Sequence, residues 1–216
     1  MDNADVVSWA WYITRASALV GFFLLYISIL FGSIGRIPIF RRFSAKICAL
    51  NIHCWLSVQA LIFALIHGVA LIFDNLLTFS WLDVFVPFHS SYETTLVALG
   101  TISFYLILIL VLTSYARKYI SRKSWRIAHT LNLVLYGFSI VHALSLGTDM
   151  KNDLVRNIFI YFNVLLILIL ALNVYFRIKG RTARQVINIP QCDANIREGD
   201  AAGGQKRSRE DFRRRI

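Results

Sequence analysis

The chain has 216 residues, of which 57% are hydrophobic, with a mean hydropathy of +0.59 and a formal net charge of +11. The length allows one domain, and so apolar a composition argues against a soluble domain and indicates a membrane protein. The positive charge lies in loops and in the C-terminal tail, which indicates membrane topology and contact with lipid rather than nucleic-acid binding. The three cysteines have no metal-binding or redox spacing, so no disulfide framework is expected.

Five apolar stretches are long enough to cross a hydrocarbon core of about 30 Å, which requires roughly 20 helical residues. They lie near residues 9–32, 47–73, 94–115, 125–146 and 155–176. The sequence therefore predicts an all-α membrane bundle of five transmembrane helices.

The loops predict the orientation of this bundle, because cytoplasmic loops are enriched in Lys and Arg. The first loop has four basic residues between 36 and 46, and the third has five between 117 and 126. The second loop has three acidic residues and no Lys or Arg, and its Trp81 and Tyr92 are expected at the outer headgroup level. The N-terminus is predicted outside and the C-terminus in the cytoplasm, with residues 178–216 forming a basic, disordered cytoplasmic tail.

Four of the five histidines lie in two of the predicted spans, His53 and His67 in the second and His129 and His142 in the fourth. Ionisable side chains inside a membrane are costly and usually functional. The second and fourth spans run in the same direction, because an even number of crossings separates them. The predicted pairs are therefore His53 with His129 near the cytoplasmic side, and His67 with His142 toward the outside.

Each pair can supply two axial nitrogens to a haem held between two helices. The spacing of 14 residues in one span corresponds to about 21 Å along a helix, and that of 13 residues in the other to about 19.5 Å. On an ideal helix His53 and His67 differ by about 40°, whereas His129 and His142 differ by about 140°. The fourth span is therefore expected either to be distorted, for example at Gly137, or to bring one of its histidines to the site obliquely. His89, in the second loop, is expected to lie far from any partner, as an ordinary interfacial histidine or as a contact for an external metal.

These motifs resemble the ferric reductase-like transmembrane domain family. The resemblance is carried by the H-x13-H of His53 and His67, the WRxxH that ends at His129, the spacing to His142, and the opening WYITRASALVGFFLLY. The family includes the membrane part of the NADPH oxidases, the ferric reductases, and the haem-binding membrane subunit of bacterial periplasmic methionine sulfoxide reductase.

The resemblance covers roughly residues 9–177, and the predicted dihaem transmembrane domain is residues 1–177. The resemblance implies two b-type haems whose iron is bound by the four histidines. Stretches such as VPFHSSYETTLVALG are similar to bacterial members. That similarity implies an integral protein of the bacterial cytoplasmic membrane.

The resemblance also implies roles for further residues. Arg15 is expected to pair with a propionate of the outer haem or to lie beside the electron acceptor, the alternative being an arginine that extends to the headgroups. Arg126 and Lys123 are candidates for pairing with inner-haem propionates, or are simply basic loop residues. Tyr136 lies between the haems or in the core, and Gly68 admits a porphyrin or a neighbouring helix.

The NADPH oxidases and fungal-type ferric reductases have a cytoplasmic flavin and nicotinamide domain after the last span, whereas here about 40 residues follow it, without a GxGxxG motif. The expected function is transmembrane electron transfer, as a component of an oxidoreductase and without acid–base or nucleophilic catalytic residues. A separate flavoprotein reductase or membrane quinol would donate the electrons. Ferric iron, oxygen or a partner oxidoreductase would accept them outside.

The alternative is a non-enzymatic membrane scaffold or a transition-metal-binding or transport subunit of the same fold, since imidazole also binds zinc and copper. A third alternative is a member of the resembled family that has kept the fold and lost its electron donor.

Overall fold

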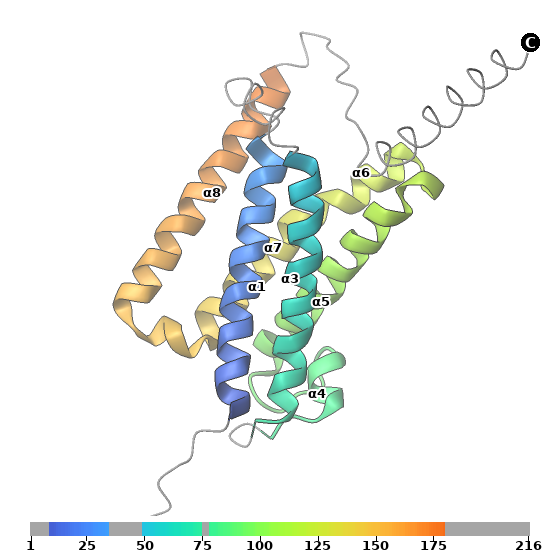
Figure 1. Ribbon diagram of the computed structural model, residues 1–216. Helices are drawn as coiled ribbons and strands as arrows, with labels where there is room; N and C mark the ends of the chain where they lie inside the picture. Colours follow the sequence, from blue (N-terminus) through green and yellow to red (C-terminus); the bar gives the residue numbers. More distant parts are fainter. Residues whose placement is uncertain (1–8, 35–48, 75–77, 180–216) are drawn as a thin grey trace, which may run out of the picture. The chain divides into compact units, whose positions relative to one another are not determined.

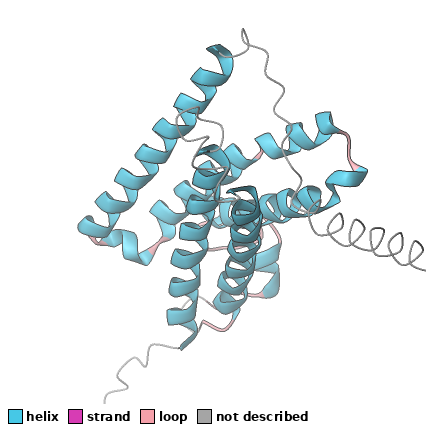
Figure 2. Cartoon of the chain, turned by 45° about the horizontal axis from the view of Figure 1, so that its top comes forward, coloured by secondary structure: helices cyan, strands magenta, loops and turns pink. Residues whose placement is uncertain are grey.

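The computed structural model describes residues 9–34, 49–74 and 78–179. Within these ranges every regular element is a helix and no strand occurs (Figure 2). The long helices are α1 (Trp9–Ile34), α3 (Ala49–Ile72), α5 (Thr94–Tyr115), α6 (Arg122–Thr130), α7 (Asn132–Leu146) and α8 (Asp153–Lys179). Three shorter ones are α4 (Trp81–Phe85) and the 3-10 helices η2 (Ala116–Tyr119) and η3 (Thr148–Lys151).

Five segments are long and apolar enough to cross a membrane, with α6 and α7 together forming the fourth. Their ranges are 9–33, 51–72, 94–119, 122–146 and 153–175. The prediction of an all-α fold with five such helices is confirmed, and it is compatible with an integral membrane protein. Helices satisfy every backbone hydrogen bond within the segment, which is what the lipid interior requires of an apolar stretch. The orientation of the termini stays a prediction.

Two helix pairs have the most extensive backbone contact, α1 with α3 and α5 with α7 (Figure 1). The buried core includes residues from all five spans, among them Leu25, Ala60, Leu110, Leu135 and the fully buried Leu166. The ring of Phe22 on α1 lies 4.8 Å from that of Phe159 on α8. Beyond Asn157, most of the exposed side chains of α8 are large and apolar, as expected for a membrane-spanning helix.

The fourth span is interrupted at Leu131, between α6 and α7. The amide of Leu131 donates to the carbonyl of Ala128 at 3.0 Å, the three-residue spacing of a 3-10 turn. This turn advances about 120° per residue instead of about 100°. Over three residues this adds about 60°, which reduces the offset between His129 and His142 from about 140° to about 80°. The predicted position of the distortion was wrong, because α7 runs through Gly137 without a break.

The second loop contains α4, whose N-terminus has a reciprocal capping box between Ser80 and Asp83. The Tyr105 hydroxyl on α5 donates to the carbonyl of Phe85 at 2.8 Å and holds the end of α4 against α5. Hydrogen bonds from the side chain and then the backbone of Ser80, followed by one from His89, lower the pKa of Asp83 to about 2. The expectation that His89 lies far from any partner is wrong, since its Nδ1 is 2.9 Å from Oδ1 of Asp83.

The chain divides into two compact units, residues 1–173 and 174–216. All the helices that carry histidines belong to the first unit. The predicted basic tail (178–216) lies outside the described residues except for its first two, and the basic residues of the first loop lie outside them entirely.

Candidate functional site

The structure brings the four membrane histidines together as two pairs, those that the direction of the spans predicts. The rings of His53 on α3 and His129 on α6 have centroids 6.1 Å apart and planes inclined at 78°. The rings of His67 on α3 and His142 on α7 have centroids 6.4 Å apart and planes inclined at 82°. We name them the inner pair (His53 and His129) and the outer pair (His67 and His142), after the predicted orientation.

The separation within each pair matches a single metal atom between two imidazoles. A metal–nitrogen bond of about 2 Å on each side and a ring radius of about 1.1 Å place trans axial ring centroids about 6.2 Å apart. Two rings joined directly by an in-line hydrogen bond of about 2.9 Å would have centroids only about 5.1 Å apart. The observed 6.1 and 6.4 Å are close to the first value, and they also lie within the range of about 4.5–7 Å for rings in edge-to-face contact.

Helix α1 fixes both histidines of α3 through its backbone. Nδ1 of His53 donates to the carbonyl of Ser28 at 2.8 Å, and Nδ1 of His67 donates to the carbonyl of Thr14 at 3.0 Å. The two carbonyls are 14 residues apart, as are the two histidines, so one antiparallel register of α1 on α3 serves both. A ring that donates through Nδ1 keeps the lone pair of Nε2 for a metal, which is the usual arrangement around metal-bound histidine.

Helix α5 holds His142 in the same way. Nδ1 of His142 donates to the carbonyl of Leu96 at 2.8 Å. Gly100, one turn further along α5, leaves room for the ring: a Cβ at this position would lie 2.5 Å from Cε1 of His142. The carbonyl and the glycine therefore lie four residues apart on one face of α5, and together they position the ring.

In the inner pair, a carbonyl and a glycine four residues apart on α1 position His53 in the same way. The carbonyl of Ser28 accepts from His53, and Gly32 lies four residues further along, where a Cβ would be 3.2 Å from Nδ1 of the ring. Sequence reasoning missed Gly32 and Gly100. The sequence does show a glycine within each of these apolar spans, α1 and α5. It does not show that a histidine on another helix lies opposite that glycine.

The glycines that sequence reasoning selected have other surroundings. A Cβ on Gly68 would meet Cγ1 of Val84 at 3.1 Å, so this glycine makes room for α4. A Cβ on Gly137 would have nothing within 4 Å. Tyr136 is buried, donates its hydroxyl to Oδ1 of Asn163 and stacks on Phe22 with centroids 6.0 Å apart, so its role in core packing is what the structure shows.

Arg15 forms an ion pair with Asp149 of η3, with Nε 3.2 Å from Oδ2 and a second contact between its terminal nitrogen and Oδ1. Its guanidinium also lies over the ring of Trp11, 4.1 Å from the centroid. Sequence reasoning did not anticipate this pair, which joins the start of α1 to the segment after α7. A contact between Arg15 and a cofactor stays a prediction.

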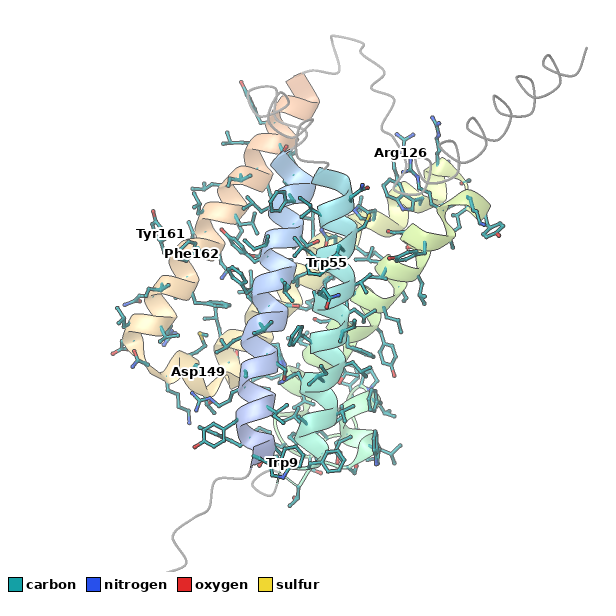
Figure 3. The ribbon with its side chains drawn as sticks, in the orientation of Figure 1. Trp9, Trp55, Arg126, Asp149, Tyr161 and Phe162 are labelled. Atoms are coloured by element: carbon teal, nitrogen blue, oxygen red, sulfur yellow. The ribbon has the colours of Figure 1, made fainter. Side chains whose placement is uncertain are left out.

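Near the inner pair, Trp125 stacks on His129 with centroids 4.9 Å apart and planes inclined at 18°. The guanidinium of Arg117 lies 4.6 Å from the centroid of the Trp125 ring. Arg126, a predicted propionate partner, is exposed, and its Nε is 3.4 Å from the carbonyl of Arg122. Figure 3 shows Arg126 at the opposite end of the helices from Asp149.

The four histidines do not gather with other ligand types. Among the described residues, no group of three or more His, Cys, Asp or Glu side chains is placed to hold a metal ion. A zinc site usually takes three or four protein ligands, whereas haem iron needs only two, because the macrocycle supplies four nitrogens. Each pair offers two histidines, which is the number of side chains that a haem iron would need.

A family model described as a domain of unknown function (DUF8596) matches residues 9–149, more than half of the chain and both histidine pairs. No curated protein matches the chain. No solved structure matches it either.

Proposed function

The chain belongs to the DUF8596 family, for which no function is described, and from its own residues we propose that it is a membrane cytochrome with two bis-histidine b-type haems. One observation carries this proposal. Two histidine pairs have ring centroids 6.1 and 6.4 Å apart, the spacing of two imidazoles on one metal atom. The resemblance to the ferric reductase-like transmembrane domains supports the same assignment.

The residues of the chain hold the axial nitrogens in place. Carbonyls of Ser28, Thr14 and Leu96 accept from Nδ1 of three of the histidines, which leaves the Nε2 of each ring available to a metal atom. Haem, when bound, supplies a centre that takes up and releases single electrons. Because two histidines would hold each haem, external ligands would be excluded and electron transfer would be favoured over chemistry at the metal.

In this proposal electrons cross the membrane from the inner to the outer pair. The histidines on α3 are separated by about 21 Å of helix, most of the hydrocarbon thickness. The donor is a separate flavoprotein or membrane quinol on the cytoplasmic side, and the acceptor outside is ferric iron, oxygen or a partner oxidoreductase. The protein is placed in the bacterial cytoplasmic membrane. The orientation rests on the basic first and third loops.

Vesicles test this function directly. The haem-loaded full chain is reconstituted into liposomes that enclose ferricyanide, and a membrane-impermeant reductant is added outside. Wild-type protein is expected to reduce the enclosed ferricyanide. His67→Ala or His53→Ala is expected to abolish this reduction, because each removes a ligand of one of the two proposed haem sites. His89→Ala, outside both pairs, is the matched control and keeps the rate. Equal rates in wild-type and protein-free vesicles would contradict the proposal.

A further inference from the structure

Trp125 has a buried hydrogen-bond donor that the described residues leave unused. Its Nε1 is inaccessible to solvent and has no hydrogen-bond partner in that part of the chain. An indole N–H can only donate, and a buried indole usually finds an acceptor. The geometry therefore points to an acceptor that is supplied by a bound group.

The position of this donor is beside the inner pair. Trp125 precedes His129 by four residues on α6, and the two rings are stacked with centroids 4.9 Å apart. His129 in turn faces His53 across 6.1 Å, at an inclination of 78°. A group held between the two histidines would therefore have its edge within reach of the tryptophan.

The charge around Trp125 favours an anionic acceptor. The guanidinium of Arg117 lies 4.6 Å from the centroid of the indole ring. Between Glu93 and Asp149 the sequence has no acidic residue and five basic ones. A guanidinium binds carboxylate and phosphate oxygens strongly because its forked donors match their geometry. Together, one indole donor and one guanidinium suit an anionic oxygen.

We propose that Trp125 and Arg117 form an anion site that binds a propionate carboxylate of the inner haem, with Nε1–H as donor and the guanidinium as counter-charge. This inference rests on the proposed function. It adds a second set of groups to Arg126 and Lys123, whose pairing with the inner-haem propionates stays a prediction. The phosphate of a lipid headgroup has the same oxygen chemistry, so the test separates the two sources.

The test measures the midpoint potentials of both haems by redox titration of the full chain in detergent. Trp125→Phe removes the donor and keeps the ring, and Arg117→Gln removes the charge. Each is expected to lower the potential of the inner haem alone, because a propionate that loses a hydrogen-bond donor or a neighbouring positive charge favours the ferric state. A tenfold change in that preference corresponds to about 59 mV. Trp55→Phe and Arg156→Gln are the matched controls, since both residues are exposed and lie outside the proposed site, and they leave both potentials unchanged.

A second arm identifies the acceptor. The chain without haem is loaded with haem dimethyl ester, which has no free propionates. The proposal expects Trp125→Phe and Arg117→Gln to have no further effect on the ester-loaded protein. A shift that persists with the ester and disappears when phospholipid is stripped would overturn it in favour of a lipid phosphate. Two haems with unshifted potentials in both variants would overturn the anion site alone, whereas a wild-type chain without haem would overturn the proposed function as well.

Discussion

Replacing Gly100 with alanine is expected to weaken the outer haem site selectively. The added Cβ would lie 2.5 Å from Cε1, 2.8 Å from Nδ1 and 3.0 Å from Nε2 of His142. Carbon atoms in ordinary contact are about 3.5–4.0 Å apart, so the ring has to move by about 1 Å. This movement disturbs the hydrogen bond of 2.8 Å to the carbonyl of Leu96 that orients the ring. Losing such an outer partner typically weakens metal binding by about 10–100-fold.

The assay is the transfer of haem from the purified chain to an excess of apomyoglobin, followed by its absorbance. Gly100→Ala should release one of its two haems about 10–100-fold faster than wild type, by the same argument. Gly137→Ala is the matched control, because a Cβ there meets nothing within 4 Å. Gly32→Ala, whose Cβ would be 3.2 Å from His53, should have a smaller effect on the other haem. Release of both haems at the wild-type rate from Gly100→Ala would refute the reasoning.

Three further predictions concern other parts of the molecule. The histidine planes are inclined at 78° and 82°, so the oxidised protein should give the highly anisotropic low-spin electron paramagnetic resonance signal of perpendicular axial imidazoles; a rhombic signal of parallel planes would be inconsistent with both angles. Tyr136→Phe removes the buried donor to Asn163 and should lower stability by about 1–3 kcal/mol, measured by thermal unfolding in detergent, with an unchanged midpoint as the opposing result. Because the folded pKa of Asp83 is about 2, below the usual value of about 3.9, its contribution to the α4 cap is present above about pH 4 and lost as the pH falls through 2. Trp81 fluorescence should report that loss, and Asp83→Asn should already be altered at neutral pH; identical pH profiles would argue against the cap.

The spans and the histidine pairs could be predicted because they depend on properties that are local in the sequence. Apolar length identifies a membrane helix, and an even number of crossings places His53 and His129 at the same end. Neither the apolar length nor the number of crossings depends on how side chains pack. The 140° offset in the fourth span stayed unresolved, because it is calculated for an ideal helix. The 3-10 turn at Leu131 depends on how α6 and α7 pack, and no glycine or proline marks it.

The groups that position the rings could not be predicted for a different reason. The acceptors for His53, His67 and His142 are backbone carbonyls on other helices, and every residue type has such a carbonyl. Which one lies opposite a histidine depends on helix register. The importance of Gly100 follows only from that register, as does the pairing of Arg15 with Asp149 across 134 residues.

The most direct test of the central claim is the number of haems per chain in the purified protein, taken from reduced-minus-oxidised visible spectra after haem-replete expression. We predict a b-type spectrum with two haems per chain. His67→Ala and His142→Ala should each retain one haem, and the double variant should still retain one, because both residues serve the same site. A chain without a b-type signal, or a double variant that loses both haems while each single variant loses one, would contradict this claim.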